Sequence, residues 1–110
     1  MERITIEIDL RGKVNVLGVR VTGEVDAATA PELRRILGDT TDGDGIGTVL
    51  LDLSGVTTMD LAGVEALLGA DQQISGAGAA MRIVEASPVV TDAVDAAGVA
   101  DRLPVPHESR

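Results

Sequence analysis

The chain has 110 residues and a formal net charge of −9, and 45% of its residues are hydrophobic although none is aromatic. The length predicts a single domain over residues 1–110, with an ordered core over about 3–105 and a tail over 106–110. The negative charge disfavours nucleic acid and anionic lipid as partners, and the lack of cysteine excludes disulfides, thiol nucleophiles and cysteine-ligated zinc.

The first part of the chain predicts an antiparallel hairpin. Residues 4–8 alternate apolar and polar side chains, as a half-buried strand does. Residues 14–21 alternate again after the turn Arg11-Gly12-Lys13. A slip in this second alternation at Leu17-Gly18 predicts a bulge or turn there.

A helix is expected to begin at Thr29. The Thr29 side chain would cap the helix, Glu32 stands three residues further on as in a capping box, and Pro31 lies in the first turn, where no N–H is needed. Residues 23–28 are interpreted as the connection before it. Residues 39–47 consist almost entirely of turn formers and predict the one mobile loop.

The middle of the chain predicts a buried strand and a second helix. Residues 48–53 form a nearly continuous apolar run, which is typical of a central strand buried on both faces. Residues 54–59 are interpreted as a connection, and Asp60 as the cap of the helix that follows. The apolar residues at helical spacing in that helix are Leu61, Val64, Leu67, Leu68 and Ile74.

The last part of the chain predicts a strand over 80–84, a third helix and a short edge strand over 103–105. Ser87-Pro88 indicates the start of the helix, with Ser87 as its cap, and Gly98 indicates its end. The expected buried stripe of this helix consists of Val89, Val90, Ala93, Val94 and Ala97.

This order of elements indicates an α/β fold. We expect a mixed sheet that opens with an antiparallel hairpin and continues with alternating helices and mainly parallel strands. No segment reaches the ~18 apolar residues needed to cross a membrane, and the first residues contain no apolar run of signal-peptide length. We therefore expect a soluble, cytoplasmic protein with no membrane insertion.

Few residues offer catalytic or metal-binding chemistry. The lone histidine, His107, lies in the tail, and no second histidine could complete a Ser-His-Asp triad. Asp42 begins a spacing similar to a calcium loop, but Ile46 and Leu53 stand where ligands should be. No glycine-rich phosphate loop with a following lysine is present. We expect no catalytic residue, no metal and no cofactor, and hence no enzyme.

Asp26 and Asp60 are the carboxylates that the topology could bring together. Both precede helices at the ends of strands, and in open α/β sheets such ends form the usual binding edge. Asp60 is expected to act mainly as a helix cap. Because Thr29 is the expected cap of the first helix, Asp26 is left with either a surface contact or a turn-forming role.

Three segments taken together resemble the STAS family, which is named for sulfate transporters and anti-sigma-factor antagonists. They are residues 23–33, residues 49–63, and residues 78–84 followed by Ser87-Pro88 and Ala97-Gly98-Val99. The resemblance covers residues 4–105 and implies the STAS fold. It also implies a regulatory function exercised by binding a protein partner.

In the antagonist branch of that family, the unphosphorylated protein binds an anti-sigma factor that is also a serine kinase of the GHKL ATPase type, and so frees the sigma factor. Phosphorylation of the second serine in an Asp-Ser-Ser-Gly segment breaks that complex. Here the segment reads Asp60-Leu61-Ala62-Gly63, so Ala62 stands at the phosphoacceptor position. Thr57 and Thr58 are weak alternative acceptors.

The resemblance implies an anti-sigma factor of the serine-kinase type as partner, without the usual phosphorylation switch. The protein would be a monomer or a weak homodimer. The implied contact surface consists of Asp26, Asp60, Leu61, Ala62, Gly63 and Val64. Because the family serine at the place of Leu61 lies beside an exposed phosphoacceptor, we expect Leu61 to be at least half-exposed. A subunit of a transport or lipid-trafficking ATPase complex and a small-ligand-sensing STAS domain remain alternatives.

Overall fold

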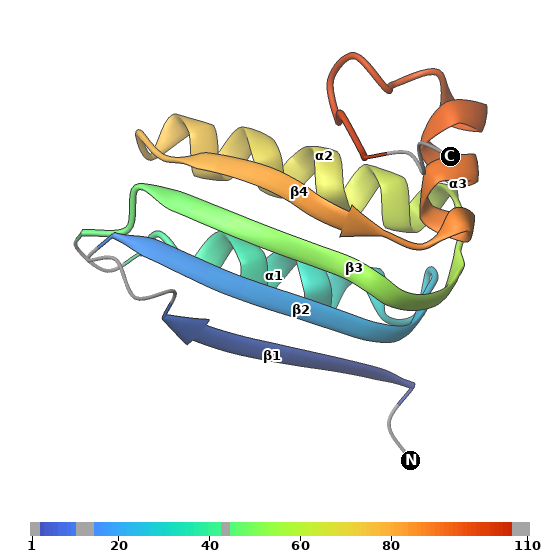
Figure 1. The fold of residues 1–110 in the computed structure, drawn as a ribbon, viewed down its shortest axis with the longest axis horizontal. Helices are drawn as coiled ribbons and strands as arrows, with labels where there is room; N and C mark the ends of the chain where they lie inside the picture. The colour runs from blue at the N-terminus through green and yellow to red at the C-terminus, as the bar shows by residue number, and fades with distance from the viewer. Residues whose placement is uncertain (1–2, 11–14, 43–44, 107–110) are drawn as a thin grey trace.

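The computed structural model describes residues 3–10, 15–42 and 45–106, and its centre is a four-stranded sheet in the order β1-β2-β3-β4 (Figure 1). Along the chain the elements are β1 (Ile4–Leu10), β2 (Val16–Val25), α1 (Ala30–Asp39), β3 (Thr48–Met59), α2 (Leu61–Gly76), β4 (Ala80–Ala86) and α3 (Pro88–Ala97). β1 pairs with β2 in antiparallel fashion, whereas the pairings β2–β3 and β3–β4 are parallel. The predicted mixed α/β architecture is therefore confirmed.

The helices α1 and α2 lie on the same side of the sheet, and α3 packs at the end of β3 and β4 (Figure 1). The burial along β3 follows from this arrangement. Val49, Leu51 and Leu53 are fully buried, whereas Leu50 and Asp52 between them are only half-buried. The prediction of burial on both faces is wrong, because α1 and α2 cover only one face of the strand.

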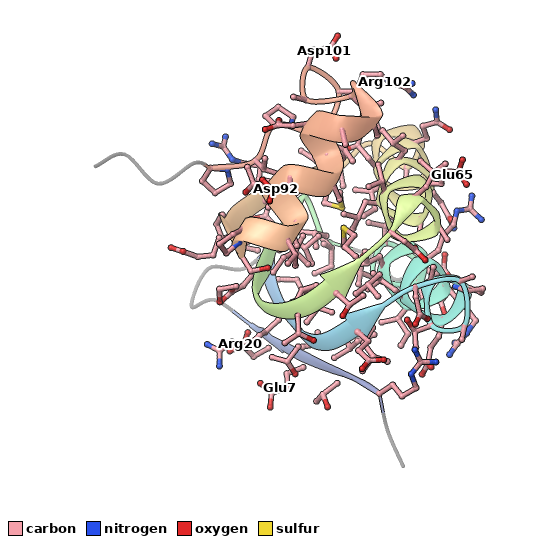
Figure 2. The ribbon with its side chains drawn as sticks, turned by 90° about the vertical axis from the view of Figure 1, so that its right-hand side faces the viewer. Glu7, Arg20, Glu65, Asp92, Asp101 and Arg102 are labelled. Carbon is pink, nitrogen blue, oxygen red and sulfur yellow. The ribbon has the colours of Figure 1, made fainter. Side chains whose placement is uncertain are left out.

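The open face of the sheet carries charged side chains. Figure 2 shows Glu7 and Arg20 on the side away from the helices. The Arg20 guanidinium lies 3.5 Å from Asp52 Oδ2 and 3.9 Å from Glu7 Oε1. Burial raises the pKa of Asp52, but hydrogen bonds from Ser54 and the nearby guanidinium outweigh this effect and hold that pKa below its usual range.

Both central strands extend further than predicted. Residues 23–25 and 54–59, expected as connections, continue β2 and β3 as paired strands. The Ser-Gly-Thr composition of 54–59 is typical of a turn, yet Ser54 stays in the strand, where its N–H and hydroxyl donate to Asp52 Oδ1 at 2.9 and 2.7 Å. Pairing with a neighbouring strand therefore overrides the local preference.

The bulge predicted at Leu17-Gly18 is absent, because the β1–β2 register is regular through these residues. The irregularities lie further along β2, in its pairing with β3. The apparent slip arises because Val16 faces the open side of the sheet, whereas Val19 and Val21 are buried beneath the helices.

The helix starts use their polar residues differently from the prediction. Asp60 is confirmed as the cap of α2, since its Oδ1 accepts from the Gly63 N–H at 3.2 Å. Thr29 occupies the N-cap position of α1 without bonding a helix N–H through its side chain, so the capping box with Glu32 is not formed. Ser87 occupies the N-cap position of α3, and its side chain likewise bonds no helix N–H.

The two hydroxyls tie their helices to neighbouring strand ends instead. The Thr29 hydroxyl donates to the Glu24 carbonyl at 2.8 Å and accepts from the Asp26 N–H at 3.0 Å. The Ser87 hydroxyl donates to the Val56 carbonyl at 2.6 Å. Each of these two hydroxyls therefore joins the N-cap residue of a helix to a carbonyl in the last few residues of a strand.

α3 buries a narrower stripe than predicted. Val90 and Val94 are fully buried, Ala93 and Ala97 are partly buried, and Val89 is 36% exposed. Val89 precedes Val90 by one position, which turns its side chain away from the buried face. Gly98 ends the helix in the left-handed conformation with φ of 72°, as predicted.

The edge strand predicted over 103–105 does not form. The N–H of Leu103 donates to the Val99 carbonyl at 2.8 Å, so it is not available to a neighbouring strand, and Pro104 has no N–H. Leu103 and Val105 nevertheless belong to the hydrophobic core. The alternating pattern correctly marked buried side chains, but the backbone does not join the sheet.

Some predictions fall outside the described residues. They concern the strand start at Val14, the turn Arg11-Gly12-Lys13, part of the loop over 39–47, and His107 with the end of the tail. Asp39, which was predicted as the first residue of that loop, is the last residue of α1.

Candidate functional site

The carboxyl ends of β2 and β3 lie side by side and bring the two predicted carboxylates into one region. Val25 is paired with Met59, so Asp26 and Asp60 follow adjacent strand ends. The Asp60 N–H donates to the Val25 carbonyl at 3.3 Å and links the two segments directly. Two parallel strands that end together thus place the starts of α1 and α2 next to each other.

Asp26 organises the turn between β2 and α1. Its Oδ1 accepts from the N–H groups of Ala28 and Thr29, at 3.0 and 3.3 Å. Its Oδ2 forms an ion pair with the Arg3 guanidinium, which also lies 2.7 Å from Glu24 Oε1. Of the two roles considered for Asp26, the structure shows the turn-forming one.

The same contacts affect the ionisation of Asp26. Burial raises the pKa of its carboxyl, but the Ala28 N–H, the Arg3 guanidinium and the Thr29 N–H favour the charged form, and together they hold this pKa below its usual range. The carboxylate therefore stays ionised in the folded protein at pH values where an ordinary aspartate is partly protonated.

This lowered pKa predicts how stability changes with pH. A carboxyl with a lower pKa in the folded than in the unfolded state stabilises the fold above its unfolded pKa of about 3.9, and the contribution is lost as the pH falls through the folded value. We expect Asp26→Asn to lower the free energy of unfolding at neutral pH, with a difference that shrinks below about pH 4. Urea titrations at several pH values measure this difference in the free energy of unfolding. Asp92→Asn, at an exposed position on α3, is the control. A difference independent of pH would contradict the assigned role.

The start of α2 separates the predicted contact residues into exposed and buried ones. Leu61 is 60% exposed, as predicted, Asp60 is exposed and Ala62 is half-buried. Gly63 and Val64 are buried, and this corrects their expected place on the contact surface. We refer to Asp26, Asp60, Leu61 and Ala62 as the strand-end surface.

Gly63 supports this surface from below. A Cβ atom at Gly63 would lie 2.9 Å from Val25 Cγ1 and 3.0 Å from Met59 Cγ, so α2 can approach the strand ends this closely only without a side chain there. Val64 packs in the core one residue further on. Both residues therefore position Leu61 and Ala62 and are covered themselves.

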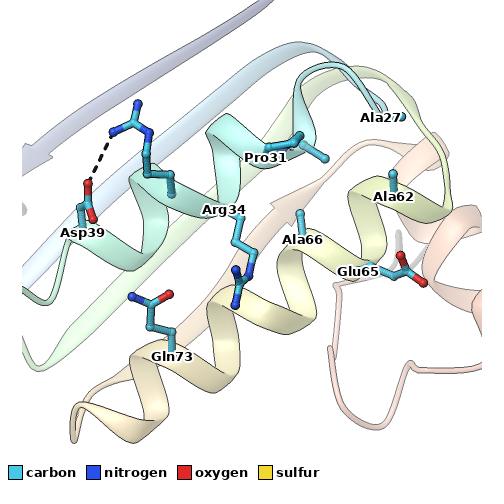
Figure 3. A pocket seen from close by; sticks show the side chains of 10 residues that line it. Ala27, Pro31, Arg34, Asp39, Ala62, Glu65, Ala66 and Gln73 are labelled. Atoms are coloured by element: carbon cyan, nitrogen blue, oxygen red, sulfur yellow. Dashed lines mark ion pairs between the residues drawn. The ribbon is translucent and has the colours of Figure 1, made fainter.

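A groove between α1 and α2 adjoins the strand-end surface and has a volume of about 580 Å³ (Figure 3). Its lining includes small side chains, among them Ala27, Ala62 and Ala66, and its charged residues include Arg34 and Glu65. Figure 3 shows the Arg34 side chain reaching from α1 toward α2.

Sequence reasoning missed this groove. Its signal was the recurrence of small residues on one side of α2, at Ala62, Ala66 and Gly69. That spacing became meaningful only when α1 was placed beside it, with the Arg34 side chain lying over Gly69.

The two threonines considered as phosphorylation sites lie at the end of β3. Thr57 and Thr58 are both exposed. The Thr57 hydroxyl donates to the Gly23 carbonyl at 3.2 Å and thereby joins β3 to β2. Within the described ranges, no group of three or more His, Asp or Glu side chains is placed to hold a metal ion. The described helices also include none that is long and apolar enough to cross a membrane.

Comparison with known proteins places this geometry in a family. An anti-sigma factor antagonist from Mycobacterium paratuberculosis has a similar structure, with a TM-score of 0.79 and 23% identity over 96% of this chain and 86% of that one. The structure of the unphosphorylated anti-sigma factor antagonist SpoIIAA has a TM-score of 0.74 and 16% identity over 94% of this chain and 90% of that one. Part of the murine Slc26a9 anion transporter has a TM-score of 0.72 and 25% identity over 83% of this chain and 15% of the transporter. Residues 7–108 match the STAS domain, and the chain belongs to the STAS domain family.

Proposed function

We propose that this protein is an anti-sigma factor antagonist that binds an anti-sigma factor of the serine-kinase type through the strand-end surface and so releases a sigma factor. The observation that carries the proposal is the 60% exposure of Leu61 at the start of α2, beside the acidic turn of Asp26. The similar structures from Mycobacterium paratuberculosis and of SpoIIAA are anti-sigma factor antagonists, which supports this class of partner.

The chemistry of the surface fits a protein partner with an apolar and a basic part. A leucine that becomes buried on binding contributes about 1–2 kcal/mol, and a serine at the same position would contribute far less. The carboxylates of Glu24, Asp26 and Asp60 lie at the ends of β2 and β3, and the single Arg3 guanidinium pairs with two of them. The remaining negative charge favours approach of a positively charged partner surface. The groove between α1 and α2 extends the available contact area beyond Ala62.

We further propose that phosphorylation does not switch this surface at the usual position. Ala62 carries a methyl group where the family pattern has its phosphoacceptor hydroxyl. A phosphoryl group would add a charge of about −2 to an already acidic surface and would disfavour binding. Without an acceptor, the protein stays able to bind while the kinase is supplied with ATP.

Partner binding is tested by titrating the protein into purified serine-kinase anti-sigma factors encoded by the genome that carries this gene. Leu61→Ser should weaken binding about 5–30-fold, which corresponds to the loss of one buried leucine. Val89→Ser is the matched control, because Val89 is an exposed apolar residue on α3, outside the strand-end surface. Equal effects of the two substitutions, or no binding to any of these kinases, would refute the proposed surface and partner.

The phosphorylation proposal is tested by incubating the protein with the bound kinase and Mg-ATP. Mass spectrometry should detect no stoichiometric phosphate on the unchanged chain, whereas Ala62→Ser should become phosphorylated and should then lose affinity for the kinase. Stoichiometric phosphate on Thr57 or Thr58 would mean that the switch has moved and is not absent.

A regulatory domain of a transport system is the second candidate. It is favoured by the similarity to part of the Slc26a9 anion transporter, at 25% identity. This candidate predicts that the protein binds none of the kinases and does not displace a sigma factor from them. Size-exclusion chromatography of preformed complexes of sigma and anti-sigma factor, with and without the protein, distinguishes the two candidates.

A further inference from the structure

A second groove lies at the β4 edge of the sheet, where the chain after α3 passes along β4 and α2. It has a volume of about 530 Å³, within the range of small-molecule sites. We call it the C-terminal groove. The residues that define it are Met81, Arg82, Ile83, Arg102, Leu103 and Val105.

The outer wall of this groove is held in place by the core. Leu103 and Val105 are only 2% and 8% exposed, so the segment is anchored at two points. Between and after them, Pro104 and Pro106 lack the N–H that pairing with β4 would require. The segment therefore lies beside β4 without joining the sheet, and the space between them stays open.

The charge of the groove differs from that of the molecule. Three other arginines, Arg3, Arg20 and Arg35, each lie within 4.0 Å of a carboxylate. In the part of the chain that the structure describes, Arg82 and Arg102 form no such ion pair, and of the remaining described arginines the same is true of Arg34 on α1.

Arg82 and Arg102 are among the described residues that line the groove, and Asp71 is the one carboxylate among them. In a chain of net charge −9, this local excess of positive charge marks a place where an anion is favoured. Figure 2 shows Arg102 beyond α3, at the far end of the molecule from Glu7 and Arg20.

We propose that the C-terminal groove binds a small amphiphilic anion: a carboxylate or phosphate group joined to a short, unbranched hydrocarbon tail. Guanidinium groups suit such head groups because their N–H donors match the geometry of two anionic oxygens, and Arg82 and Arg102 supply them. Met81, Ile83, Leu103 and Val105 surround the tail. None of these residues belongs to the strand-end surface, so the site is independent of the proposed partner binding.

The test uses the full chain with methyl-labelled side chains and four probes. Octanoate and octyl phosphate carry both halves of the proposed ligand, octanol lacks the charge, and inorganic phosphate lacks the tail. We expect saturable shifts of the Met81, Ile83, Leu103 and Val105 methyl signals with the first two probes below their micelle concentrations. The signal of Leu61 should stay in place. Comparing octanoate with octyl phosphate shows which head group is preferred.

Two variants then test the arginines. Arg82→Gln and Arg102→Gln should each weaken binding of the better probe about tenfold, since each removes a charged hydrogen bond. Arg35→Gln changes an exposed arginine on α1 and should leave the affinity for this probe unchanged. Any one of three results would overturn the proposal. The first is an unaltered affinity in the double Arg82→Gln, Arg102→Gln variant. The others are shifts confined to other methyl groups, and binding of octanol or inorganic phosphate as strong as that of the better probe.

Discussion

Gly23→Ala should lower the free energy of unfolding by about 3 kcal/mol, because it combines backbone strain with a steric overlap. Gly23 has φ of +106°, a conformation that residues with a side chain rarely adopt. A Cβ atom at this position would also overlap the carbonyl oxygen of Arg3. The clash would push β1 away from β2 where the Glu24 N–H donates to that same oxygen at 2.8 Å.

Two other glycines separate the strain from the overlap. Gly78 has φ of +88° but open space around it, so Gly78→Ala should cost only the strain, about 1–2 kcal/mol. Gly76 ends α2 without a positive φ and with open space around it, so Gly76→Ala should be neutral or stabilising by up to about 1 kcal/mol. Urea titrations of the three variants rank the effects. Equal losses for Gly23→Ala and Gly78→Ala would show that the approach of Arg3 contributes nothing.

Leu67→Ala should destabilise the protein by about 2–5 kcal/mol, whereas Leu61→Ala should change its stability by less than about 0.5 kcal/mol. The two leucines are in the same helix, but Leu67 is fully buried in the core and Leu61 is 60% exposed. Truncation of Leu67 leaves a cavity among core side chains, whereas truncation of Leu61 mainly removes a group from water. Denaturant titration of both variants measures the contrast.

The comparison also bears on the proposed function. If Leu61 lies on the contact surface, Leu61→Ala should lose affinity for the anti-sigma factor while it keeps its stability. A loss of several kcal/mol for Leu61→Ala would instead place this side chain in the core of the protein as it exists in solution. It would then have no place on the strand-end surface.

The amino-acid sequence by itself determined the kind and order of the elements from β1 to α3, although it also predicted an edge strand over 103–105 that does not form. Its alternating and helical patterns predicted the hairpin, the three helices and the parallel strands, because one buried face imposes a fixed period on each element. Local chemistry was equally predictive where a residue acts on its own neighbours. Asp60 caps α2 and Gly98 ends α3, since both roles depend on backbone only a few residues away.

Only the tertiary structure decided how polar groups and strand ends are used. Thr29 and Ser87 have hydroxyls suited to capping, but they bond to carbonyls at neighbouring strand ends, acceptors that are in place only after folding. Residues 54–59 have the composition of a turn and become strand because β2 offers a partner. The partners of Ser87 and of residues 54–59 are distant in sequence, so no local pattern contains them. The partner of Thr29 is only five residues away, but its carbonyl is held in place by the sheet.

The candidate sites show the same division. The exposure of Leu61 was expected because the segment Asp60-Leu61-Ala62-Gly63 resembles the family pattern, and the structure confirms it. The ion pair of Arg3 with Asp26, the groove between α1 and α2, and the place of Arg82 and Arg102 in the C-terminal groove could not be deduced from the sequence. The physical reason is that local period and composition set which way a side chain points, whereas packing of the elements sets what it meets there.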